Sequence, residues 1–202
     1  EGSRAGVLVS TKKEEPQKNE EHLKRPKVLD CDIIRFKNDN ENWIAFVGLL
    51  NGIPYEVFTG LQEEDMFPIP KAITKGKIIK NKDEDGNTRY DIQYIDKYGY
   101  KNTLGGLSHQ FNKEYWNYAK LISSVLRYGM PIVDVVRLVS SLQLDNVTIN
   151  TWKNGVERSL KRYIPDGTKV KNGVRCEKCN TDSLVYQEGC LTCTNCGHSK
   201  CG

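Results

Sequence analysis

Long hydrophobic runs are missing from this 202-residue sequence. Its longest apolar stretch, around residues 43–50, is much shorter than the roughly 18–20 residues that a membrane-spanning helix needs. A basic segment followed by an apolar one is also missing at the start, which excludes a secretory signal there. Because the sequence opens with Glu1 and not with Met, we expect it to be a segment of a longer protein.

A strong excess of charge of one sign is missing as well. The sequence has 30 Lys and Arg against 26 Asp and Glu, a net charge of +4. A balance this mild allows some attraction to nucleic acid but does not argue for it. Hydrophobic residues make up 38% and charged residues 28%, which permits a modest core and argues against a wholly disordered chain.

Cysteine is nearly absent from the first 175 residues, where only Cys31 occurs, and the other six of the seven cysteines follow. An odd number gathered at one end is unlike the framework of a secreted disulfide-rich protein. We therefore expect a reducing compartment, the cytoplasm, with metal-bound and redox-active thiols near the C-terminus. Cys31 stands alone on a predicted strand and is expected to be a small buried hydrophobic residue.

Residues 1–24 are dense in Lys, Glu, Gln and Asn and contain few apolar residues. Such a segment buries too little surface to offset the entropy lost on ordering, so we expect a flexible charged linker. Residues 25–165 are expected to form one domain, with strands to about residue 105 and helices after it. Residues 166–202 form a third segment, which carries the clustered cysteines.

Strand signals dominate the region from residue 28 to residue 97. The segments KVLDCDIIRF and NWIAFVGLL are rich in Val, Ile and Phe, and NDNEN between them supplies turn residues. Asn51-Gly52 is a favoured two-residue hairpin turn, and KDEDGN separates two further strand-like segments. These patterns predict four or five antiparallel strands.

Helical spacing of apolar residues follows the strands. The first predicted helix ends at Gly129, a good C-cap, and Pro131 suits the first turn of the second. A third helix is expected from about residue 149 to residue 163. The predicted core stripes are Tyr115, Tyr118, Ile122, Val125 and Leu126; Ile132, Val135, Val136 and Val139; and Ile149, Trp152, Val156 and Leu160. Strands followed by helices predict an α+β fold, with a small antiparallel sheet covered on one face by about three helices.

Two C-x-x-C pairs indicate a metal site in the last segment. Cys176 and Cys179 form the first pair, and Cys193 and Cys196 form the second. Each pair can bring two thiolates to one tetrahedral ion, and the interval between the pairs is long enough for one β-hairpin. So short a segment has little core and gains stability from a metal ion, which favours zinc over an iron–sulfur centre or two redox dithiols. The sequence therefore predicts a zinc ribbon over residues 166–202.

Two cysteines of this segment, Cys190 and Cys201, exceed the four ligands that zinc needs. If the strands that enter and leave the second C-x-x-C turn pair antiparallel, these two lie opposite each other, within disulfide range. They are then a candidate redox pair, with Lys200 beside Cys201 to favour the thiolate. Alternatively, Cys196 and Cys201 form the redox pair and Cys190 is a zinc ligand, or both surplus thiols are inert.

Several segments resemble adenosylcobalamin-dependent ribonucleotide reductases. MPIVDVVRLVSSLQ, TWKNGVERSLKRYIPDGT and LVYQEGCLTCTNCGHSKCG are similar to the C-terminal region of these enzymes. The strand segments KRPKVLDCDIIRF and WIAFVGLLNGIPYEVF resemble the domain that precedes the cysteine-rich tail. The likeness covers most of residues 25–202, and the tail is its most specific part.

The resemblance implies a role in deoxyribonucleotide synthesis. These enzymes reduce ribonucleotides with a cysteine radical generated from adenosylcobalamin, and each turnover leaves a disulfide in the catalytic barrel. A C-terminal cysteine pair then reduces that disulfide and is itself reduced by thioredoxin or a similar donor. By this resemblance Cys190 and Cys201 are the shuttle, and the zinc ligands are Cys176, Cys179, Cys193 and Cys196. The barrel and the cobalamin site are expected upstream, so this segment alone should not be active.

Two other functions compete with this interpretation. Zinc ribbons often bind nucleic acid, and the third predicted helix is basic enough to contact phosphates, through Lys153, Arg158, Lys161 and Arg162. However, Tyr186 is the one aromatic residue in residues 166–202 on which a base could stack. The third possibility is a purely structural zinc module that mediates assembly.

Overall fold

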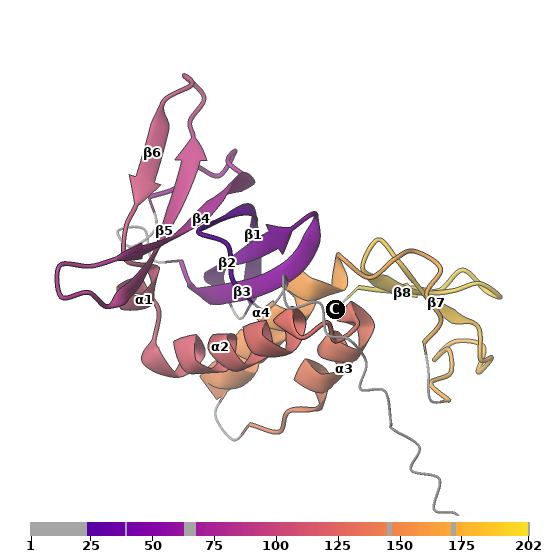
Figure 1. The fold of residues 1–202 in the computed structure, drawn as a ribbon. Coiled ribbons are helices and arrows are strands. Elements are labelled where there is room, and N and C mark those ends of the chain that lie inside the picture. The colour runs from indigo at the N-terminus through magenta and orange to yellow at the C-terminus, as the bar shows by residue number, and fades with distance from the viewer. Residues whose placement is uncertain (1–23, 39, 63–67, 145–146, 171–172, 202) are drawn as a thin grey trace, which may run out of the picture.

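The computed structural model describes residues 24–38, 40–62, 68–144, 147–170 and 173–201 (Figure 1). The predicted linker lies almost wholly outside these ranges. The described residues form a six-stranded antiparallel sheet, four helices and a second, three-stranded sheet near the C-terminus. This is the predicted α+β fold. No helix among the described residues is long and apolar enough to cross a membrane.

The larger sheet consists of two three-stranded meanders joined side by side. Its spatial order is β3 (Ile53–Leu61), β2 (Glu41–Leu50), β1 (Val28–Asn38), β4 (Lys75–Lys82), β5 (Thr88–Ile95) and β6 (Lys101–Leu104). Asn51 and Gly52 both have positive φ, 52° and 79°, which confirms the two-residue hairpin turn. Strand β6 was not predicted because its four residues, KNTL, carry one apolar side chain.

Four helices follow the sheet in sequence: α1 (Leu107–Gln110), α2 (Lys113–Arg127), α3 (Ile132–Ser141) and α4 (Val147–Lys161). The Asn112 side chain caps α2 by accepting from the Glu114 N–H at 2.8 Å, and Gly129 follows the helix with φ 78°. One turn of helix, α1, is too short for periodicity to reveal. The predicted stripes are largely buried, although the side chain of Ile149 lies outside the described residues.

The larger sheet is strongly curled. Three strands separate β3 from β5, so a flat sheet would hold them about 19 Å apart. Instead, the rings of Phe58 on β3 and Tyr90 on β5 lie 5.6 Å apart between centroids, and Trp116 of α2 stacks on Phe58 at 4.6 Å. The curl encloses one core cluster, in which Cys31 is 2% exposed, as predicted.

Strand β2 is buried on both faces, and here the prediction of a sheet covered on one face is wrong. Trp43, Ala45 and Val47 face a second core cluster, formed with α2, α3 and α4, whereas Ile44 and Phe46 face the inside of the curl. Burial on both faces explains why the apolar run in β2 is uninterrupted. Gly155 in the middle of α4 allows this helix to pack closely against Phe36 of β1, because a Cβ at Gly155 would lie 2.3 Å from the Phe36 ring.

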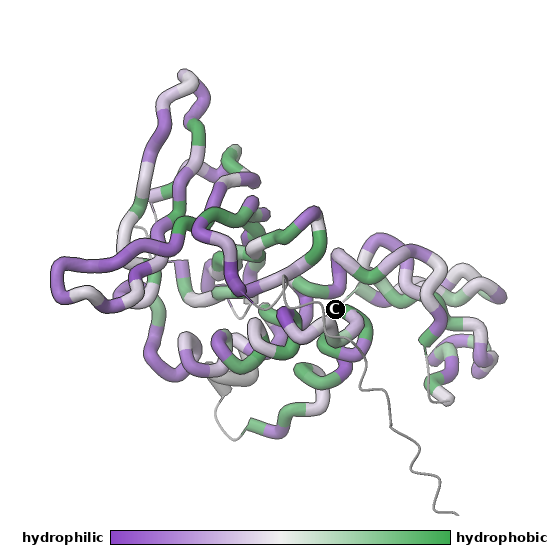
Figure 2. Tube along the Cα trace, viewed as in Figure 1, coloured by the Kyte–Doolittle hydropathy of each residue, from purple (hydrophilic) through white to green (hydrophobic). Residues whose placement is uncertain are grey.

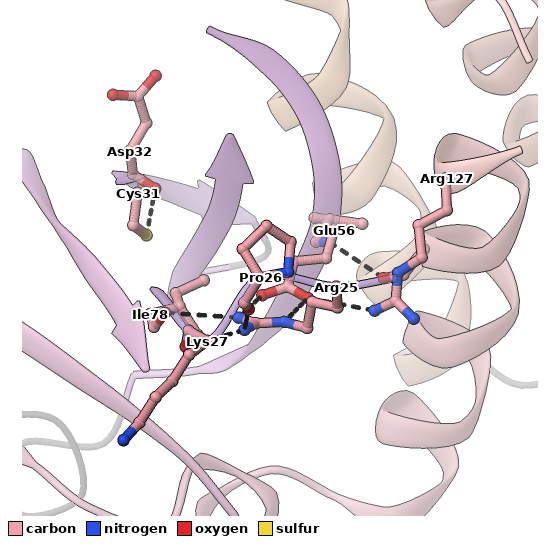
Figure 3. Close-up of polar contacts among 10 residues, drawn as sticks. Arg25, Pro26, Lys27, Cys31, Asp32, Glu56, Ile78 and Arg127 are labelled. Atoms are coloured by element: carbon pink, nitrogen blue, oxygen red, sulfur yellow. Dashed lines mark hydrogen bonds and ion pairs between the residues drawn. The ribbon is translucent and has the colours of Figure 1, made fainter. Parts of the chain in front are cut away.

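A buried ion cluster links the edge strand β3 to strands β4 and β5 across the curl of the sheet (Figure 3). Glu56 of β3 is fully buried and accepts two hydrogen bonds from the Arg25 guanidinium, at 2.8 and 2.6 Å. The same guanidinium reaches the Ile78 carbonyl of β4 at 3.4 Å and lies over the Tyr90 ring of β5. Arg127 of α2 adds a second cation, 3.3 Å from Glu56.

Candidate functional site

The C-terminal sheet is a small ribbon formed by β7 (Leu184–Gln187), β8 (Cys190–Cys193) and β9 (Ser199–Lys200), in that order. Glu188 and Gly189 form a tight turn between β7 and β8, with φ of 49° and 77°. Strand β9 pairs antiparallel with β8, through Leu191↔Lys200 and Thr192↔Ser199. This pairing brings the chain on both sides of the second C-x-x-C turn together, as the sequence predicted.

Four thiols converge at one end of the ribbon: Cys176, Cys179, Cys193 and Cys196, whose Sγ atoms all lie within 4.8 Å of one another. The Sγ atoms of Cys176 and Cys196 are 3.6 Å apart, and so are those of Cys179 and Cys193. A tetrahedral ion with sulfur ligands at about 2.3 Å would separate its ligands by about 3.8 Å. The four thiols can therefore hold one metal ion with little rearrangement.

The backbone around each C-x-x-C pair has the tight conformation that such turns require. Asn180 and Gly197 follow the two pairs with φ of 53° and 71°. The Asn180 N–H donates to the Cys176 carbonyl at 2.8 Å, and the Gly197 N–H donates to the Cys193 carbonyl at 2.9 Å. Left-handed backbone is accessible to Gly and Asn, so these two residue types explain why both turns form at these positions.

Hydrogen bonds favour ionised sulfur at two of the four thiols, Cys179 and Cys193, whereas the pKa of Cys196 is raised. The Thr181 hydroxyl lies 3.1 Å from Cys179 Sγ, and the Asn195 amide donates to the same sulfur at 3.7 Å. The Thr181 side chain and backbone, followed by Asn195, lower the pKa of Cys179 to about 5. The pKa of Cys193 is also lowered, chiefly by a hydrogen bond from the Cys196 backbone. Thiolate is the form of cysteine that binds metal.

Sequence reasoning missed Thr181, although its position two residues after a C-x-x-C pair was a usable signal. Its hydroxyl also lies 3.8 Å from Cys193 Sγ, and its carbonyl accepts from the Cys176 N–H at 3.0 Å. One residue thus contacts both C-x-x-C turns. Its role is to position two of the four thiols.

Thr181→Val should weaken metal binding without removing a ligand. We expect the dissociation constant for zinc to rise about tenfold or more, because groups that hydrogen-bond to ligands have effects of this size. Competition with a chromophoric chelator measures it. Thr192→Val is the matched control, since the Thr192 hydroxyl contacts Ser199 at 3.0 Å and is expected to leave zinc binding unchanged. Equal zinc affinity in the two variants would contradict the role of Thr181.

The remaining two cysteines of the ribbon are bonded to each other. A disulfide joins Cys190 and Cys201, whose Cα atoms are 4.4 Å apart. Cys190 begins β8 and Cys201 directly follows β9, so the pair lies next to the Leu191↔Lys200 pair in the ladder. Cys201 is exposed, and Lys200 beside it forms an ion pair with Glu177 at 2.6 Å. The structure therefore separates a four-thiol group from an accessible disulfide.

The ribbon packs directly on the α+β domain. Tyr186 of β7 lies in the core cluster that contains Trp152 and Leu160 of α4, and Leu191 of β8 packs against it. The chain between α4 and the ribbon adds backbone hydrogen bonds, since the Gly167 N–H donates to the Tyr186 carbonyl and the Tyr186 N–H donates to the Thr168 carbonyl. The position of the disulfide is thus tied to helix α4.

Fold and site together define an α+β domain joined to a cysteine-rich ribbon that can bind a metal ion. Residues 29–165 match the NrdJ homologue C-terminal domain, and the chain belongs to this family. NrdJ is the adenosylcobalamin-dependent ribonucleotide reductase, so the chain corresponds to the C-terminal region of such an enzyme, and the resemblance seen in the sequence is confirmed for the matched residues. The match ends before the ribbon. No curated protein and no solved structure matches the chain.

Proposed function

We propose that this chain supplies electrons to the catalytic barrel of a ribonucleotide reductase. In this proposal Cys176, Cys179, Cys193 and Cys196 hold a structural zinc ion, and Cys190 and Cys201 are the redox shuttle. One observation carries the proposal: four of the six clustered cysteines converge on one point, while the other two form an accessible disulfide outside that group. The same chain thus offers a metal-stabilised scaffold and a separate thiol pair.

The chemistry needed is two successive thiol–disulfide exchanges. A thiolate of the reduced pair attacks the disulfide left in the barrel, forms a mixed disulfide and releases one barrel thiol. The second thiolate of the pair then attacks its partner's sulfur, which closes the Cys190–Cys201 disulfide and releases the second barrel thiol. Two electrons and two protons pass to the barrel. A thioredoxin-like protein returns them to the pair by the same exchange in reverse.

The partners in this proposal are the upstream catalytic barrel of the same polypeptide and a thioredoxin-like reductant. Adenosylcobalamin belongs to the barrel, and zinc is the metal of this segment. The cytoplasm suits such a protein, because a reducing compartment keeps thiols available. The basic side chains of α4, which suggested nucleic acid, are largely engaged internally: Lys153 donates to the Leu142 carbonyl, Arg158 to the Lys37 carbonyl, and Lys161 pairs with Glu157.

Thiol counting on the zinc-loaded chain tests the proposal. Mild oxidation of the reduced chain should remove two titratable thiols while zinc stays bound, because the disulfide forms without using a ligand. Thiols are measured with a chromogenic disulfide, and zinc is measured by elemental analysis. A Cys190→Ser, Cys201→Ser double variant should bind the same zinc and lose no thiols. Release of zinc on oxidation of the unaltered chain would show that the pair and the ligands are not separate, and would refute the assignment.

A further inference from the structure

The β5–β6 hairpin ends in two strongly exposed tyrosines. Tyr98 is 73% exposed and Tyr100 is 71% exposed, and Lys97 lies over the Tyr98 ring at 4.8 Å. Figure 1 shows this hairpin extending away from helices α2 and α3. Tyrosine is enriched among the residues that dominate binding at protein interfaces. Two of them at the tip of a projecting hairpin therefore point to an interaction surface.

The tip is fixed in one conformation by a single carboxylate. Asp96 accepts hydrogen bonds from the backbone N–H groups of Tyr98 and Tyr100, each at 2.9 Å, and from the Asn102 side chain at 3.1 Å. Gly99 takes the left-handed conformation that the turn needs, with φ 86°. A turn that is already ordered loses little entropy when it binds. The two tyrosines are thus presented in a prearranged position.

A shallow groove of about 690 Å³ lies beside the hairpin, over strands β4, β5 and β6. Three of its lining residues are lysines, Lys75, Lys77 and Lys101, and none is a carboxylate. Asp30 approaches Lys77 only at 4.0 Å, and both side chains are more than half exposed, so this pair is weak. Ile95 adds an apolar side chain that is 52% exposed. The groove is therefore complementary to a surface that carries carboxylates and some apolar contact area.

An acidic protein surface fits this region better than a nucleic acid. The acidic β4–β5 turn, with Asp83, Glu84 and Asp85, lies at the opposite end of the β4–β5 hairpin from the groove, and Figure 2 shows this turn as hydrophilic. That turn therefore does not offset the charge of the groove, whose three lysines can each pair with a carboxylate of a protein surface but give a continuous polyanion few phosphate contacts. The exposed Ile95 also suits an apolar protein contact more than a phosphate backbone.

We infer that the β5–β6 hairpin and the lysine groove dock the α+β domain on an acidic surface of the catalytic part of the same enzyme. Tyr98 and Tyr100 supply the contact area, and Lys75, Lys77 and Lys101 pair with carboxylates of the partner surface. The domain thereby gains a task of its own, which is to hold the ribbon near the barrel. The inference rests on the proposed function only for the identity of the partner.

Hydrogen–deuterium exchange on the intact enzyme tests this docking. Backbone amides of residues 93–102 should exchange about tenfold more slowly in the intact enzyme than in the isolated 202-residue chain, because the docked hairpin is shielded. The triple variant Lys75→Glu, Lys77→Glu, Lys101→Glu should remove that protection, and so should high salt, which screens charges beyond about 10 Å at 0.1 M and more closely at 1 M. Tyr98→Ala with Tyr100→Ala should weaken the protection at low salt as well, although it leaves every lysine in place.

The matched control combines Lys120→Glu with Leu121→Ala on the exposed side of α2, where Leu121 is 66% exposed. This variant should keep full protection of the hairpin. Equal exchange in the intact enzyme and the isolated chain would overturn the inference, as would salt-dependent binding of a single-stranded oligonucleotide that the Tyr98→Ala, Tyr100→Ala variant abolishes. The exchange measurement needs no thiol, so it can be repeated with Cys190→Ser and Cys201→Ser. Failure of the electron shuttle would leave the protection intact, and failure of docking would leave the thiol count intact.

Discussion

The intact enzyme with Cys201→Ser is expected to stop after its first turnover when thioredoxin is the reductant. The barrel disulfide formed in that turnover would no longer meet a thiol pair that can reduce it. Dithiothreitol should still support repeated turnover, because a small dithiol can enter the barrel directly. Deoxyribonucleotide formed per enzyme, measured with each reductant, gives the result. We expect the thioredoxin-driven rate to fall at least about a hundredfold, since exchange needs both sulfurs of the pair.

Ser199→Ala is the control for this experiment. It removes the hydroxyl contact between Ser199 of β9 and Thr192 of β8 but leaves both sulfurs of the disulfide in place. Its activity with thioredoxin should stay close to that of the unaltered enzyme. If Cys201→Ser cycles normally with thioredoxin, Cys201 has no part in electron transfer and the shuttle must lie elsewhere.

Glu56→Gln should destabilise the α+β domain by about 3–5 kcal/mol, the range found when one partner of a buried ion pair is removed. The change keeps the shape of the side chain but leaves the Arg25 guanidinium, 2% exposed, without its carboxylate. Arg127 loses the same partner. Denaturant unfolding of the zinc-loaded chain, followed by tryptophan fluorescence, measures the free energy of unfolding.

Asp134→Asn provides the comparison for Glu56→Gln. Asp134 pairs with Arg137 one turn along α3, at 3.1 Å, with both side chains at least one-third exposed. Such a pair contributes about 0.5 kcal/mol or less. A Glu56→Gln variant as stable as Asp134→Asn would mean that the buried cluster does not hold the sheet together.

Local patterns in the sequence predicted most of the elements. Alternating and continuous apolar residues marked the strands, and Asn51-Gly52, Gly129 and Pro131 marked turns and helix ends, because each of these residues favours a particular backbone conformation. The two C-x-x-C pairs indicated the four-thiol group for the same reason, since Asn180 and Gly197 permit the turns that close it.

Features that depend on distant parts of the chain could not be predicted in this way. The curl of the sheet brings together Phe58 and Tyr90, which are 32 residues apart in sequence, so no local pattern reveals it. No sequence pattern singled out Arg25 and Glu56, because burial of an ion pair depends on the folded surroundings of both residues. Thr181 was missed because its spacing from the first C-x-x-C pair is a usable signal of proximity but does not show that the hydroxyl contacts sulfur.

The packing of the ribbon on helix α4 has a consequence for how electrons would travel. With Tyr186 set in the same core as Trp152, the sulfur pair cannot relocate far without carrying the whole folded unit along. Two electrons would thus be delivered by a folded body the size of an entire domain. If the Cys190–Cys201 pair carries electrons as proposed, its delivery requires motion of that whole unit and not only the swing of a short peptide arm.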